Sequence, residues 1–239
     1  MIVRDCGETW QVVLQTDHAE LSGALARGWA EQGPGHGSLA VAAERHDDGW
    51  AVWERAPRAD DSGKPVNFVD VDVRSHLAFY RAGIAAITEQ DADAGLLVSM
   101  HGAGIYKQRY GLDPGLGLTR AAEAQEEVDA FVAEQEAKFG GEPGSRSDDY
   151  ALLQLYDRLS LYFCMRDVES GEEAELQGYR LEPFAPWRVR IDPYPLAESP
   201  AELTLRRRVL PKRAWADGDS FRHDFFGASA EPTTITFER

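Results

Sequence analysis

Residues 150 to 165, YALLQLYDRLSLYFCM, are apolar on almost every side when they are read as a helix. Such a helix has no polar face to turn toward solvent, so we expect it to be the central helix of the core. Asp157 lies near its middle. A carboxylate buried among leucines needs a compensating cation, which can be a metal ion or an arginine such as Arg158. The sequence therefore predicts a packed helical core with a charged group inside it.

Other segments show the helical period of apolar residues, and we expect helices over 17–29, 38–46, 72–88 and 119–139. The first three carry histidines near one end of their apolar face: His18, His46 with its neighbour Asp47, and His76. His101 lies in AGLLVSMHGAGIY, residues 94 to 106. That stretch fits either a buried helix or a parallel strand followed by a glycine turn.

The chain thus carries, in order, His18, His46, Asp47, His76, His101 and Asp157. Imidazole and carboxylate ligands suit zinc, iron, manganese and nickel. Side chains on separate helices meet only when the helices pack, so a metal site here would be assembled by folding. Taken singly, each residue has an ordinary explanation. His46, for example, could balance the helix dipole at a C-terminus without binding anything.

The order His, His-Asp, His, His, Asp resembles the HD-domain superfamily of metal-dependent phosphohydrolases, over about residues 15 to 168. The resemblance implies an all-helical core with one divalent ion on His18, His46, Asp47 and Asp157, and a second on His76 and His101 with Asp47 bridging. It also implies that His46 and Asp47 are essential for catalysis. Two such ions can clamp an in-line displacement and activate a bridging water.

The sequence departs from one branch of that superfamily. Cyclic-dinucleotide phosphodiesterases continue the HD pair with a glycine and a lysine, whereas HDDGW places Trp50 at the lysine position. A diiron branch that includes inositol oxygenases uses the same ligands for dioxygen chemistry. The segments QTDHAELSG (15–23) and HDDGWAVWE (46–54) are also similar to an uncharacterised bacterial family of unknown function, which supplies no activity.

Composition limits the partners. The chain has 41 acidic and 25 basic residues and a formal charge of −16, so its own field repels a phosphate backbone and nucleic acid is not expected. No run approaches the 18 apolar residues of a membrane helix, and MIVRDCGETW does not resemble a signal peptide. Two cysteines, Cys6 and Cys164, are expected to stay reduced. We expect a cytoplasmic protein that binds a small molecule and no membrane.

Residues 2 to 14 alternate as a short hairpin, and the texture after Gly178 changes to strands punctuated by proline. We therefore expect a mainly α fold: an HD-like helical domain over 1–178, with a β appendage over 179–239 packed on it. The hairpin and the C-terminal strands should form a small antiparallel sheet. The terminal TTITFER could instead extend a sheet with a second copy in a homodimer.

These features together favour a metal-dependent hydrolase acting on a small phosphate ester or nucleotide, with a local arginine such as Arg45 or Arg109 helping to hold the phosphate. Alternatives are a non-catalytic small-molecule-binding protein of the same fold and a diiron oxygenase. HGAG at 101–104 resembles the oxyanion-loop motif of lipases and esterases. A serine esterase is nevertheless disfavoured, because the sequence has no GxSxG nucleophile elbow, and GDS at 218–220 is only a weak substitute.

Overall fold

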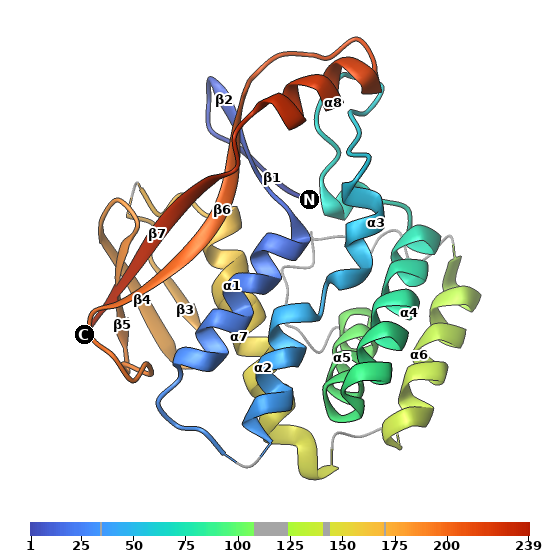
Figure 1. Cartoon of the computed structure of the whole chain (residues 1–239), viewed down its shortest axis with the longest axis vertical. Helices are drawn as coiled ribbons and strands as arrows, with labels where there is room; N and C mark the ends of the chain where they lie inside the picture. Colours follow the sequence, from blue (N-terminus) through green and yellow to red (C-terminus); the bar gives the residue numbers. More distant parts are fainter. Residues whose placement is uncertain (34, 108–123, 141–143, 170) are drawn as a thin grey trace.

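The computed structural model describes residues 1–33, 35–107, 124–140, 144–169 and 171–239. Helices gather on one side of the molecule and strands on the other (Figure 1). The helices are α1 (Gln15–Gly28), α2 (His36–Arg45), α3 (Ala51–Glu54), α4 (Val73–Gln90), α5 (Ala92–Tyr106), α6 (Gln125–Phe139), α7 (Ser147–Met165) and α8 (Gly218–Gly227). The strands are β1 (Ile2–Asp5), β2 (Thr9–Val13), β3 (Ala174–Leu176), β4 (Tyr179–Ala185), β5 (Arg188–Asp192), β6 (Ala201–Pro211) and β7 (Glu231–Glu238).

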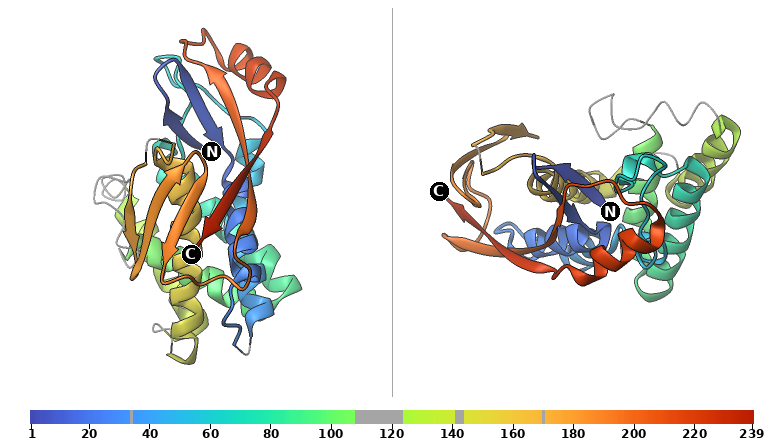
Figure 2. Two further views of the ribbon diagram at one scale, coloured as in Figure 1. Left: turned by 90° about the vertical axis from the view of Figure 1, so that its left-hand side faces the viewer. Right: turned by 90° about the horizontal axis from the view of Figure 1, so that it is seen from above.

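The strands form one seven-stranded sheet in the order β1-β2-β6-β7-β5-β4-β3. Neighbours are antiparallel except β5 and β7, which run parallel. The N-terminal hairpin joins the C-terminal strands through β2 and β6, where Trp10 lies opposite Leu210. The sheet curls around α1 and α7 (Figure 2). Strand β7 lies inside the sheet, so both of its edges are paired within the chain.

The expectation of a mainly α fold with a small antiparallel sheet is wrong. The protein is an α+β structure in which a large mixed sheet forms a full layer. The physical reason is burial: Val189 and Ile191 on β5 and Leu205 on β6 are at most 2% exposed. They belong to the same core cluster as Phe163 of α7. The strands therefore cover one face of the central helix as a full layer and not as a small appendage.

The predicted helices are present among the described residues, with shifted ends, while residues 119–123 of the helix expected over 119–139 lie outside the described part of the chain. Residues 92–106 are helical, so the helix alternative for the segment around His101 is confirmed and the strand alternative is wrong. The buried helix α7 carries Asp157 near its middle, as the sequence predicted. Within the described residues, none of the helices is both long and apolar enough to cross a membrane.

The turn after α2 brings two backbones into direct contact. The sequence suggests that Gly49 ends the preceding helix with a left-handed conformation, but Gly49 does not have a positive φ and lies in a 3₁₀ turn over Asp48–Trp50. Its role is close approach. A Cβ atom at Gly49 would overlap the backbone carbonyl of Phe79 on α4. A Cβ atom at Gly83, one turn further along α4, would lie 3.0 Å from the backbone nitrogen of Gly49. This contact fixes the segment that carries His46 and Asp47 against α4.

We predict that Gly49→Ala lowers the free energy of unfolding by about 1–3 kcal/mol, because the added methyl group must push two backbones apart. Gly227→Ala is the matched control, since a Cβ there meets no atom within 4 Å. It should change stability by less than about 0.5 kcal/mol. Urea denaturation of both variants measures the difference, and equal stabilities would contradict the close-approach argument.

Candidate metal centre

Five side chains from three helices and one turn converge in the core: His18, His46, Asp47, His101 and Asp157. His18 lies in the first turn of α1, His101 on α5 and Asp157 on α7, while His46 and Asp47 directly follow α2. All five are between 1% and 4% exposed. Each helix therefore brings one or two polar groups into an otherwise apolar interior.

Four atoms of this group are close enough to share one ion. The Nε2 atom of His18 lies 3.1 Å from Asp47 Oδ2 and 3.7 Å from Asp157 Oδ1. The Nε2 atom of His46 lies 3.7 Å and 3.4 Å from the same two oxygens. The two Nε2 atoms are 3.2 Å apart. Ligands bonded at about 2.0–2.2 Å to one ion lie roughly 3.0–3.5 Å from each other, so these spacings fit a single centre.

The outer nitrogens of both histidines are held by hydrogen bonds. His46 Nδ1 lies 2.8 Å from the carbonyl of Ala43 and must donate to it. His18 Nδ1 lies 2.7 Å from the hydroxyl of Ser160, which itself donates to the carbonyl of Asp157 at 2.8 Å. Ser160 therefore accepts from His18. In the neutral rings both Nε2 atoms then carry lone pairs directed into the group, as in metal-bound histidines.

The charge balance also favours a cation. Burial opposes a charge on His46, but the carboxylates of Asp47 and Asp157 outweigh burial and raise its pKa to about 9. Burial acts against the charge on Asp47 as well, yet His46 and His18 hold the pKa of this carboxyl well below its usual value. Two carboxylates thus stay ionised in the core, and a proton on His46 can supply the positive charge between them.

His101 and His76 relate differently to this centre. The hydroxyl of Tyr80 donates to Asp47 Oδ1 at 2.8 Å and lies 3.2 Å from His101 Nε2, so it stands between these two residues. Ligand atoms of His101, His46 and Asp157 nevertheless lie within 4.8 Å of one another. Burial, helped by the charge on His46, lowers the pKa of His101 to about 3. His76 is outside both groups of candidate ligands and is hydrogen-bonded to the hydroxyl of Tyr106.

Tyr80, Tyr106 and Ser160 are not among the site residues that the sequence predicts. Tyr80 lies one turn after His76 on the same helical face, which was the available signal. Trp50, the residue at the lysine position, is 1% exposed and packs against His76 and Phe79.

The remaining residues of interest in the sequence have other roles or lie outside the described part of the chain. Arg45 pairs with Asp48 at 2.7 Å, and Arg109 lies outside the described residues. The HGAG motif at 101–104 is part of α5, so it does not form an oxyanion loop. Ser220 takes part in the capping box of α8.

Fold and site together define an α+β protein with a buried histidine–aspartate centre. The family model described as "Protein of unknown function (DUF3891)" matches residues 1–212, and the chain belongs to this family. The matched region contains every residue of the centre. No curated protein and no solved structure matches the chain.

Removing the hydroxyl that orients His18 should destabilise the protein. Ser160→Ala leaves the buried Nδ1–H of His18 without its acceptor, and we expect the free energy of unfolding to fall by about 1–3 kcal/mol. Ser99→Ala is the control, because Ser99 is equally buried and its hydroxyl has no hydrogen-bond partner among the described residues. Thermal and chemical denaturation should show a clearly smaller loss for Ser99→Ala. The reverse order would contradict the assigned hydrogen bond.

The raised pKa of His46 predicts a pH dependence for protein stripped of metal. The folded state holds the His46 proton more tightly than the unfolded chain does. The protonated ring therefore contributes its full stabilisation to the free energy of unfolding below pH 6.5, and this stabilisation is lost as pH rises through about 9. Unfolding free energies of chelator-treated wild type and His46→Gln should be measured across this range. Wild type should lose more stability than the variant, and parallel curves would show that His46 carries no such proton.

Proposed function

We propose that this protein binds one divalent metal ion through His18, His46, Asp47 and Asp157 and hydrolyses a small phosphate ester with it. The observation that carries the proposal is the convergence of four donor atoms, with separations of 3.1–3.7 Å between the histidine nitrogens and the carboxylate oxygens. Agreement of these residues with the order of the HD-domain superfamily adds support. When bound, such an ion polarises a phosphoryl oxygen and lowers the pKa of a coordinated water.

The donor set suits a divalent cation. His18 and His46 would each offer a neutral Nε2 atom, while Asp47 and Asp157 would bring two negative charges that balance the charge of the ion. A neutral unit of this kind is far less costly to bury than the separate charges. Two nitrogen and two oxygen donors suit zinc, iron, manganese or nickel, with selectivity set by geometry and supply.

The surroundings favour one ion over two. A bridging role for Asp47 would need its Oδ1 atom, which accepts a hydrogen bond from Tyr80 at 2.8 Å. Tyr80 also contacts His101, a proposed ligand of the second ion, and Tyr106 engages His76, the other. In this arrangement His101 stays neutral, because burial and the charge on His46 lower its pKa to about 3.

The substrate class follows from charge. A net charge of −16 disfavours a long polyanion, and Trp50 replaces the lysine that meets phosphate in the cyclic-dinucleotide branch. A phosphomonoester or a nucleotide is small enough to be held mainly by the ion, because attraction at close range exceeds that of distant, screened charges.

A second candidate is a structural metal site without catalysis. The observation in its favour is burial, since all four donors are between 1% and 4% exposed. Structural sites are closed by protein ligands, whereas catalytic sites keep a position open for water or substrate. The experiments below separate the two functions.

Metal content is the first measurement. Protein purified without chelator or a metal-affinity column should contain close to one equivalent of a transition metal per chain by elemental analysis. Asp157→Ala should lose this metal, because a ligand is removed from a four-donor set. His223→Ala should retain it, since the His223 side chain is 88% exposed and belongs to neither group of candidate ligands. Two equivalents in the wild type, or unchanged metal in Asp157→Ala, would contradict the assignment.

Catalysis is the second measurement. Apo protein supplied with manganese, iron, nickel or zinc should be assayed against phosphomonoesters, nucleotides and cyclic dinucleotides. Hydrolysis of a phosphomonoester or nucleotide should vanish in His46→Ala and Asp47→Ala and persist in His223→Ala. Fully metallated protein without turnover on any substrate would exclude the phosphohydrolase and favour the structural site.

A further inference from the structure

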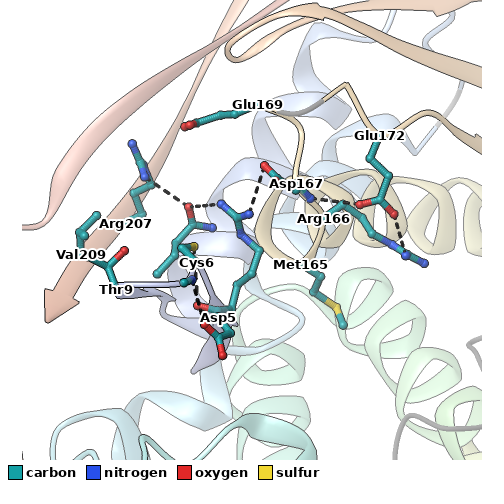
Figure 3. A pocket seen from close by; sticks show the side chains of 13 residues that line it. Asp5, Cys6, Thr9, Met165, Arg166, Asp167, Glu169, Glu172, Arg207 and Val209 are labelled. Atoms are coloured by element: carbon teal, nitrogen blue, oxygen red, sulfur yellow. Dashed lines mark hydrogen bonds and ion pairs between the residues drawn. The ribbon is translucent and has the colours of Figure 1, made fainter. Parts of the chain in front are cut away.

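A second polar site lies outside the metal centre. A pocket of about 690 Å³ opens between strands β1, β2 and β6 and the segment that follows α7 (Figure 3). None of its lining residues belongs to the metal centre. Its volume is within the range of about 300–1,000 Å³ that is typical of small-molecule sites. Its lining includes the guanidinium groups of Arg4 and Arg207 and the side-chain amide of Gln11.

Gln11 joins two guanidinium groups at the floor. This residue on β2 is 1% exposed, and its Nε2 atom donates to the carbonyl of Cys164 at 3.3 Å. That bond fixes the amide, so its Oε1 atom faces the pocket. Oε1 accepts from Arg4 Nη2 and from Arg207 Nη1, each at 3.3 Å. Two cations therefore share a single neutral acceptor.

Neither arginine is fully compensated. The other contacts of Arg207 are the hydroxyl of Thr233 at 2.7 Å and the ring of Trp187 at 4.9 Å, both neutral. Arg207 meets no carboxylate within the described residues. Arg4 lies 3.3 Å from Asp167, whose side chain is 51% exposed, so solvent weakens this pair.

A buried donor beside the pocket is also unused. The Nε–H of Arg4 has no acceptor among the residues that the structure describes, although it is buried. Such donors normally find a partner, which can be a water or a ligand. A carboxylate or phosphate group is the natural partner of paired guanidinium groups, because its oxygens are negatively charged and can accept hydrogen bonds from both.

We propose that this pocket binds a small molecule through an oxyanion head, a carboxylate or a phosphate, held between Arg4 and Arg207. The rim limits the ligand further. Glu169 accepts from Trp187 Nε1 at 2.6 Å, and Glu172 pairs with Arg166 at 2.8 Å. Both carboxylates line the pocket, so they repel a body with further negative charges. The ligand therefore carries one anionic head on a neutral or cationic body.

The test uses the full-length protein and three probes at low ionic strength: acetate, glycine and inorganic phosphate. Titration calorimetry and NMR should detect saturable binding of at least one of them. Binding of acetate and glycine without phosphate identifies a carboxylate head, and the reverse identifies a phosphate. Glycine binding more tightly than acetate identifies a cationic body. No saturable binding of any probe would overturn the proposal.

Arg207→Gln and Arg206→Gln form a matched pair for this test. Arg206 is the adjacent residue on β6, points to the opposite face and pairs with Glu20, and both variants lose the same charge. Arg207→Gln should weaken binding at least about tenfold, while Arg206→Gln should bind as wild type does. Equal affinities in the two variants would overturn the proposal.

A measurement on wild type does not depend on the folding of either variant. In ¹⁵N-labelled protein, the bound probe should shift backbone amide resonances of residues 4–11 and 207–209 and leave those near His18 and Asp157 unchanged. Shifts confined to other regions would place the ligand elsewhere and contradict the assignment. Loss of hydrolysis in the metal experiments would not affect this outcome, because the two sites share no residue.

Discussion

The meeting of two buried carboxylates with two imidazoles is the interaction on which the helical half of this protein depends. Asp47 and Asp157 are at most 4% exposed, and burying them as charged groups would be prohibitive without close positive or hydrogen-bonding partners. Since His18 and His46 supply those partners from other segments, α1, α2 and α7 must approach at fixed angles and heights. Ser160 and the carbonyl of Ala43 then fix the rotation of each ring. The helix packing and the donor geometry are therefore one constraint.

The helices and most of the centre could be predicted from sequence for a common reason. Long apolar periods identify helices without knowledge of their neighbours, and Asp157 stands out because its own neighbours are apolar. Local patterns were less informative at the ends. Asp17 and Glu20 suggest a capping box, but α1 begins at Gln15, whose N–H donates to Glu54 Oε1 at 2.5 Å. Glu54 is distant in sequence, so no local pattern could show this cap.

The residues that the sequence did not reveal depend on tertiary contacts. Tyr80 has the spacing of an ordinary core residue, and only the position of α5 shows that its hydroxyl lies between Asp47 and His101. The sheet was underestimated for a similar reason. Alternation predicts that a strand exists, but it does not identify the partner of β2 or predict the parallel pairing of β5 with β7. The size of a sheet is a property of those pairings.

The pairing of β2 with β6 also has a kinetic consequence. Thr9 lies opposite Pro211, so this part of the sheet joins segments about two hundred residues apart. Contacts of such long range are slow to form, because the chain must lose the entropy of closing a long loop before any stabilising contact is made. During synthesis the N-terminal hairpin is complete long before β6 emerges. Until then the edge of β2 that later pairs with β6 has unpaired N–H and C=O groups. The nascent chain thus exposes an aggregation-prone edge, which only the last part of the protein covers.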